Sequence, residues 1–159
     1  MLMNEKETTS THRKDIQYVW GLISQSSAID EERNNISLFN VIDQISVSSE
    51  GFAGDGKTKV NMPHEISLTW RRTVGVSLAN KPVSFGCRIE LVDPTGDVLE
   101  QVTKTFKLQE NSRRTRQRIR VDGFVITEPG DYVYRVKTKE DDDDDFQTVN
   151  EIPFEVRKQ

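Results

Sequence analysis

The sequence predicts an all-β fold, an antiparallel β-sandwich of about seven to nine strands in a single domain. From residue 16 onward, apolar side chains recur at every second position, which is the repeat of a strand with one buried face. Turn-forming residues interrupt these runs at short intervals, as they do in sandwiches and barrels. No segment longer than one turn has the 3.6-residue repeat of an amphipathic helix.

One domain is the expectation for 159 residues, because domains usually contain about 100–200 residues. We assign residues 16–159 to the sandwich. Residues 1–15 are polar and begin MLMNEKETTSTHRKD, which favours a flexible tail. This leader has no apolar core, and no stretch approaches ~18 apolar residues, so we expect no membrane partner.

The N-terminal half contains three of the predicted strand regions. Two of them, YVWGLIS and ISLFNVIDQISV, flank the polar segment AIDEERNN, which has room for one helical turn at most. The third is EISLTWRR, residues 65–72, in which Ile66, Leu68 and Trp70 share one side. Ser67, Thr69 and Arg71 share the other side, so we expect a strand with one apolar face.

The C-terminal half contains clearer alternation. In VSFGCRIEL, residues 83–91, every second side chain is apolar, and DYVYRVKT and EIPFEV repeat the pattern. The segments DPTGD and EPGD have the composition of turns between strands. Tyr132, in PGDY, resembles the tyrosines that pin a corner of a sandwich.

Composition limits the classes of function. The net charge of −4 argues against non-specific nucleic-acid binding by the whole molecule. The one cysteine, Cys87, cannot form an intramolecular disulfide, and no cysteine cluster is available for zinc. A reducing, cytoplasmic location fits this composition.

Residues 51–58, GFAGDGKT, match the phosphate-loop pattern G-x-x-x-x-G-K-[ST]. A working phosphate loop also needs a helix directly after it, so that the helix N-terminus faces the anion. Pro63 would interrupt the second turn of such a helix. We therefore interpret the three glycines as a loop between strands, and a nucleotide-binding enzyme that uses Lys57 and Thr58 as the least favoured function.

A row of arginines is the most distinctive candidate site. Arg114, Arg116, Arg118 and Arg120 have the same parity and would lie on one face of a strand, with Ile119 toward the core. The row could bind an acidic protein surface or nucleic acid, since guanidinium forks suit carboxylates and phosphates. It could also be a solvated outer face, or it could pair with nearby acids. No aromatic residues alternate with the arginines, which disfavours a single-strand stacking surface.

The segment EDDDDDF, residues 140–146, predicts an acidic loop made of Asp141, Asp142, Asp143, Asp144 and Asp145. Mutual repulsion of its charges favours an extended conformation. The run lacks the ligand spacing and the glycine of a calcium loop, so we predict no metal. Residues 104–120 carry seven positive charges and one negative charge, and residues 140–145 carry six negative charges. These opposite blocks suggest head-to-tail self-association.

Other catalytic chemistry finds little support. Neither histidine, His12 or His64, has a neighbour at zinc-ligand spacing, and Cys87 alternates with apolar residues as a core side chain does. The serines show no nucleophile motif. We predict no catalytic residues and no cofactors.

The segments Asn34–Ile42, Arg88–Gly96 and Pro129–Val136 carry a resemblance to a family of uncharacterised bacterial β-sandwich proteins. The resemblance covers roughly residues 16–157 and implies the fold alone, because its motifs are structural. It implies no activity and no binding site. The arginine row and the aspartate run depart from the family pattern.

The function that the sequence favours is a non-enzymatic binding or assembly module. Its contacts would be the loop 51–58, the arginine strand and the acidic loop, and its partner a protein, including a second copy of the chain. The alternative is a nucleic-acid-binding accessory protein that uses the four arginines.

Overall fold

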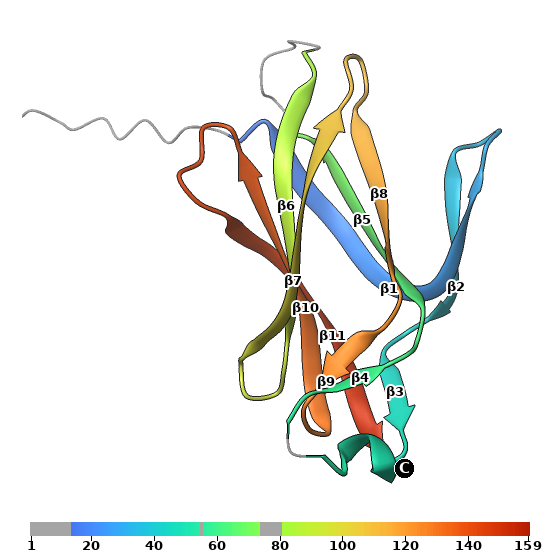
Figure 1. Ribbon diagram of the computed structural model, residues 1–159. Coiled ribbons are helices and arrows are strands. Elements are labelled where there is room, and N and C mark those ends of the chain that lie inside the picture. The colour runs from blue at the N-terminus through green and yellow to red at the C-terminus, as the bar shows by residue number, and fades with distance from the viewer. Residues whose placement is uncertain (1–13, 55, 74–80) are drawn as a thin grey trace, which may run out of the picture.

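The computed structural model describes residues 14–54, 56–73 and 81–159. Within these ranges the chain forms eleven β-strands and one short 3-10 helix, without an α-helix (Figure 1). In chain order the elements are β1 (Ile16–Asp30), β2 (Asn35–Val41), β3 (Gln44–Val47), η1 (Ser49–Phe52), β4 (Thr58–Val60), β5 (His64–Arg72), β6 (Val83–Val92), β7 (Val98–Leu108), β8 (Arg114–Val121), β9 (Phe124–Ile126), β10 (Gly130–Glu140) and β11 (Gln147–Lys158).

Two large sheets enclose the hydrophobic core. One sheet has the order β2-β1-β5-β8 and the other β3-β11-β10-β6-β7, while β4 and β9 form a separate pair. The ring of Trp70 on β5 lies 5.0 Å from that of Phe85 on β6, so the two sheets meet through aromatic contacts. The predicted all-β sandwich in a single domain is confirmed.

The strand count is higher than predicted. β4 and β9 contain three residues each, which is too short for alternation to be recognised in the sequence. β3 pairs with β11 in parallel, whereas the other pairings are antiparallel. Pairing direction depends on where the connections bring two strands together, and alternation within each strand does not encode it.

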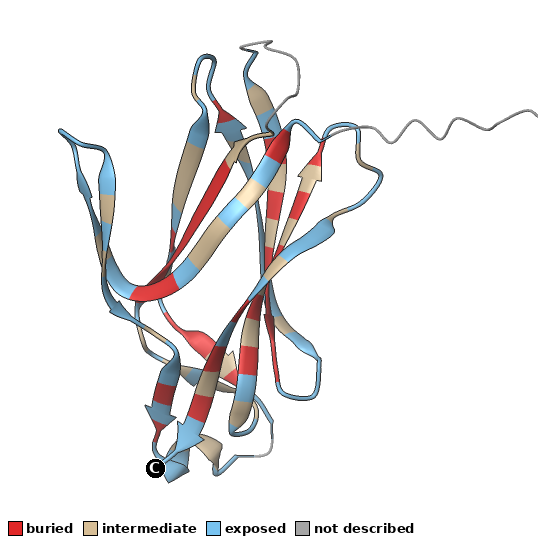
Figure 2. Ribbon diagram, turned by 180° about the vertical axis from the view of Figure 1, so that it is seen from behind, coloured by how far each residue is buried: buried red, intermediate tan, exposed pale blue. Residues whose placement is uncertain are grey.

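The segment AIDEERNN is a hairpin turn and not a helical turn. β1 continues to Asp30, which pairs with Asn35 at the start of β2. Asn34 closes the turn with a φ of 53°, a left-handed conformation that asparagine tolerates. The sheet curls, so this hairpin stands away from the core on one side of the molecule (Figure 1) and is largely exposed (Figure 2).

The predicted corner at Tyr132 is confirmed. Its hydroxyl donates to the carbonyl oxygen of Glu128 at 2.6 Å and accepts from the backbone N–H groups of Thr127 and Glu128 at 3.0 and 3.1 Å. Asp93 holds the neighbouring turn, since its Oδ1 accepts from the N–H groups of Thr95 and Asp97. Its Oδ2 accepts from the Thr127 hydroxyl and joins the two turns.

Of the predicted tail, residues 1–13 lie outside the described residues, as does Asp55 of the glycine-rich loop. The described residues include no helix long and apolar enough to cross a membrane.

Candidate functional site

The four arginines lie on one face of β8, as the sequence predicts. Ile119, between them, is buried at 7% exposure, so the arginines point to the outer side of the sheet. On β5 they are paired with polar residues: Arg114 with Arg71, Arg116 with Thr69, Arg118 with Ser67, and Arg120 with Glu65. We call the outer surface of β5 and β8 formed by these eight residues the arginine face.

Two arginine side chains reach across β5. Nη1 of Arg118 donates to the hydroxyl of Ser27 on β1 at 3.3 Å. Nη2 of Arg116 donates to the carbonyl oxygen of Asn34, in the β1–β2 turn, at 3.2 Å. β1 lies on the far side of β5 from β8, so both guanidinium groups extend over β5 to reach these uncharged acceptors.

This crossing explains why β5 is buried on both sides. Ser67 and Thr69 have the outward parity that the sequence predicts, yet they are only 0% and 4% exposed. The expectation that only the apolar side of this strand is covered is therefore wrong. Alternation describes the direction of a side chain, and cover on the outer side comes from long side chains of neighbouring strands.

The buried layer beneath the guanidinium groups contains polar atoms without a partner. The Ser67 Oγ, the Thr69 Oγ1 and the Arg116 Nε are inaccessible and make no hydrogen bond. Leaving a buried polar group unsatisfied costs about 1–3 kcal/mol. These three groups lie on neighbouring residue pairs of β5 and β8. Their hydrogen-bonding capacity is therefore not fully used in the unbound chain.

One carboxylate lies within the arginine face. Glu65 is 6% exposed, accepts a hydrogen bond from the Ser27 hydroxyl and forms an ion pair with Arg120 at 3.5 Å. By contrast, Arg116 and Arg118 contact uncharged oxygens, and Arg114 and Arg118 are exposed. The face therefore has an excess of positive charge.

The acidic loop joins β10 to β11 and does not adopt the extended form we expected. Asp143 turns back on Glu140: its N–H donates to the Glu140 carbonyl oxygen at 3.0 Å, and its Oδ2 accepts from the Glu140 N–H at 2.8 Å. Asp143 also pairs with Lys14. These local bonds outweigh the repulsion between adjacent aspartates, which remain exposed at positions 141, 144 and 145.

Phe146 attaches this loop to the second sheet. The Arg88 guanidinium lies 4.1 Å from the centre of its ring, and the ring covers Gly86. Gly86 and Arg88 are on the outer side of β6, because Phe85, Cys87 and Ile89 are buried in the core. The end of the loop is therefore on the outer side of one sheet and the arginine row is on the outer side of the other, while Asp143 contacts Lys14 just before β1.

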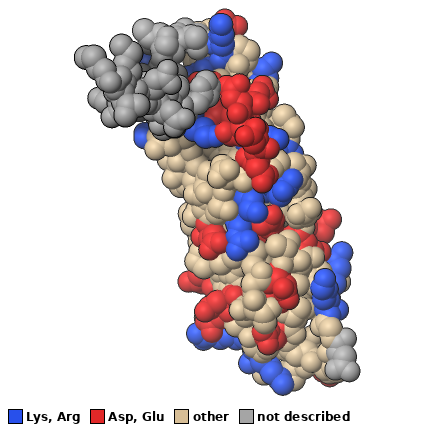
Figure 3. All heavy atoms as spheres, turned by 90° about the vertical axis from the view of Figure 1, so that its left-hand side faces the viewer, with Lys and Arg blue, Asp and Glu red and all other residues tan. Residues whose placement is uncertain are grey.

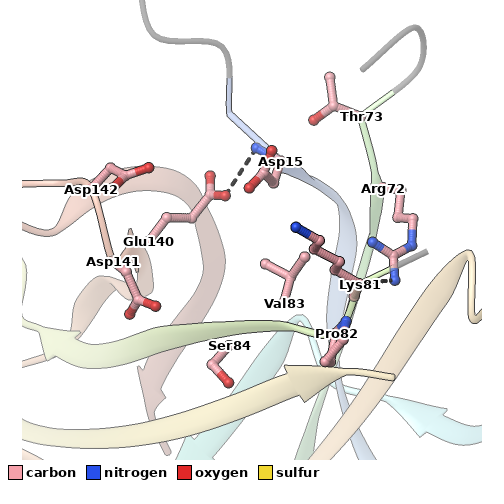
Figure 4. Close-up of a pocket in the computed structure, with 10 residues that line it drawn as sticks. All are labelled: Asp15, Arg72, Thr73, Lys81, Pro82, Val83, Ser84, Glu140, Asp141 and Asp142. Carbon is pink, nitrogen blue, oxygen red and sulfur yellow. Dashed lines mark hydrogen bonds between the residues drawn. The ribbon is translucent and has the colours of Figure 1, made fainter. Parts of the chain in front are cut away.

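Acidic side chains form a dense group near the upper end of the side that Figure 3 shows. A cavity of about 420 Å³ lies beside the acidic loop, between Asp15, Glu140 and Asp141 and the cations Arg72 and Lys81 (Figure 4). The Arg72 guanidinium donates to the carbonyl oxygens of residues 81, 109 and 112, so it braces the surrounding loops. Four carboxylates and two cations line the cavity, and the Arg72 guanidinium is already bound to backbone carbonyls, so the cavity does not form an anion site.

Residues 51–58 do not have the geometry of a phosphate loop. Ser49–Phe52 form the short helix η1, which precedes most of the loop, and Thr58 begins strand β4. β4 pairs with β9 through Thr58 and Ile126. Lys57 and Thr58 therefore do not stand at a helix N-terminus, which a phosphate loop requires.

His64 and Cys87 are both buried, and burial raises the pKa of the Cys87 thiol to about 12. No group of three or more potential metal ligands occurs in the described part of the chain. Sequence reasoning found the arginine row but missed Glu65, Ser67 and Thr69, because a polar residue on the outward side of a strand is ordinary. No family model matches the sequence, and no curated protein matches it either.

Proposed function

We propose that the protein is a binding or assembly module without catalytic activity, and that its arginine face binds an acidic polypeptide segment. One observation carries the proposal. Arg116 and Arg118 contact uncharged oxygens, and the buried hydroxyls of Ser67 and Thr69 on the paired strand have no hydrogen-bond partner. Such a face has unsatisfied hydrogen-bonding capacity and positive charge at the same place.

Carboxylates are better acceptors for these guanidinium groups than their present partners. The present bonds have one ionised partner, the guanidinium, whereas a carboxylate adds a second charge and accepts two parallel N–H groups at once. A carboxylate would therefore displace the Asn34 carbonyl and the Ser27 hydroxyl as acceptors. Movement of the two arginines would also uncover the hydroxyls of Ser67 and Thr69, which lie beneath them.

Spacing on a strand supports an extended acidic ligand. Residues two apart on β8 are separated by about 7 Å, and an extended peptide repeats its side chains at the same interval. Alternate acidic residues of such a peptide can meet successive arginines without distortion. Arginine binds carboxylates through two parallel N–H groups, which favours this arrangement over a diffuse attraction.

One observation favours a polypeptide over single-stranded nucleic acid. The row lacks the interleaved aromatic rings on which unpaired bases stack. The net charge of −4 and the acids Asp30, Glu31 and Glu32 beside Asn34 oppose both kinds of anionic ligand, so they do not distinguish between them.

A fluorescently labelled short poly-aspartate peptide provides the test, with anisotropy as the measurement. We expect binding at low ionic strength that weakens as salt is added. Exchanging Arg114→Gln and Arg118→Gln together should weaken it at least about tenfold, since a charged hydrogen bond is worth ~1.5–3 kcal/mol. Both side chains are exposed, so the fold should tolerate the changes.

The matched control is Lys104→Gln with Lys107→Gln, which removes the same charge from exposed positions on β7. If both double variants weakened poly-aspartate binding equally, the arginine face would not be a specific site, and the binding would depend only on the overall charge of the chain. Tighter binding of single-stranded RNA than of poly-aspartate, lost in the arginine variant, would replace this proposal by the nucleic-acid alternative.

A further inference from the structure

We infer that the acidic segment bound by the arginine face is the Asp141–Asp145 loop of a second copy of this chain, so that copies associate head to tail. The inference rests on the proposed function of the arginine face. It adds the identity of the partner and the geometry of the assembly.

The loop has the chemistry that the face requires. Asp141, Asp144 and Asp145 are exposed, whereas Asp143 is engaged with Lys14 and Glu140. On the opposing surface Arg114 and Arg118 are exposed. Complementary charges of this kind guide two surfaces together and determine their register.

The loop and the arginine face lie on different sides of one chain. Phe146 holds the end of the loop on the outer side of β6, between Gly86 and Arg88. The arginines are on the outer side of β8, in the other sheet. Figure 1 shows the connection between β10 and β11 on one side of the sandwich, and β8 with the curled hairpin on the other. We therefore assign the loop to the arginine face of another molecule.

Opposite placement also determines the type of assembly. Two surfaces that face away from each other cannot both be used between the same two molecules around a two-fold axis. Each copy instead presents its loop to one neighbour and its arginine face to another, which builds rings or open chains. Assembly should therefore proceed beyond a dimer as the protein concentration rises.

Sedimentation velocity on the whole chain can test this with two complementary variants. The face variant carries Arg114→Gln and Arg118→Gln, and the loop variant carries Asp141→Asn, Asp144→Asn and Asp145→Asn. In roughly 20 mM salt the natural chain should form species larger than a dimer, and in roughly 500 mM salt it should be a monomer. Each variant alone should associate at least about tenfold more weakly.

Mixing the variants gives the decisive measurement. The face variant keeps its loop and the loop variant keeps its face, so an equimolar mixture should form a complex of one copy of each and nothing larger. The control for the loop is Glu100→Gln with Glu128→Gln and Asp131→Asn, three exposed acids elsewhere, which should assemble like the natural chain.

A natural chain that stays monomeric at low salt would overturn the inference, as would a discrete two-fold dimer or a mixture that forms no complex. Unchanged assembly of the loop variant would overturn it as well. Poly-aspartate binding by the natural chain separates the two proposals, because binding by a chain that does not self-associate leaves the proposed function standing and removes only the identity of the partner.

Discussion

Nε2 of His64 lies 2.9 Å from the hydroxyl of Tyr134, and both side chains are buried between the sheets. Nδ1 of the same ring lies 2.8 Å from the carbonyl oxygen of Met62. A carbonyl oxygen only accepts, so Nδ1 carries a proton. Burial lowers the pKa of His64 and so favours the neutral ring, in which Nε2 accepts from the Tyr134 hydroxyl and completes a small buried network.

This network makes stability depend on pH. Burial lowers the pKa of His64, although its hydrogen bond to Met62 acts in the opposite direction. The unfolded chain then binds a proton more readily than the folded chain. The contribution of His64 to the free energy of unfolding is therefore fully present above about pH 6.5 and decreases as the pH falls below that value. Urea denaturation between about pH 7.5 and about pH 5 should show this decrease. His64→Gln should flatten the dependence, and an unchanged slope in that variant would assign the effect to other groups.

Tyr132→Phe should lower stability more than the same substitution at a tyrosine whose hydroxyl makes one hydrogen bond. It removes the hydroxyl that bonds to the Thr127 N–H, the Glu128 N–H and the Glu128 carbonyl, so three part-buried backbone groups lose this partner. We expect a loss of about 1–3 kcal/mol in chemical denaturation. Tyr18→Phe is the control, since the Tyr18 hydroxyl accepts one hydrogen bond, from Asn150. Equal losses of stability in the two variants would show that the three hydrogen bonds of Tyr132 contribute no more than the single hydrogen bond of Tyr18.

Gly123→Ala should be strongly destabilising for a steric reason. A Cβ at this position would lie 2.3 Å from the carbonyl oxygen of Val60, a backbone atom held by the pairing of β4 with β9. Overpacking of this kind costs about 1–3 kcal/mol. Gly54→Ala should be nearly neutral, because nothing lies within 4 Å of the added atom. Thermal denaturation compares the two, and similar melting temperatures would contradict the close approach of β9 to β4.

Ser67→Ala and Thr69→Val should separate stability from binding. Both hydroxyls are buried without a partner, so their removal should leave stability unchanged or raise it by roughly 1 kcal/mol. If the arginine face binds carboxylates above these hydroxyls, the same variants should bind poly-aspartate more weakly. Chemical denaturation and anisotropy on the same preparations give both quantities. Lower stability with unchanged peptide binding would show that the hydroxyls are structural.

Several features of this protein follow from its sequence alone. Alternation places Phe85, Cys87 and Ile89 in the core because side chains on a strand change sides at every residue, and this direction needs no information from other strands. The same rule aligns the four arginines on one side of β8. The Tyr132 corner was also predictable, since its bonds go to residues four or five positions earlier in the chain.

Tertiary structure decided what covers each side and which segments meet. The burial of Ser67 beneath Arg118 and the contact of Arg116 with Asn34 join residues that are 51 and 82 positions apart in the chain. These contacts depend on the curl of the sheet and on the placement of β1 between β2 and β5, which alternation does not specify. Separation of the acidic loop from the arginine face likewise depends on which sheet each strand joins. Periodicity determines the direction of a side chain, whereas its neighbours depend on long-range pairing between strands.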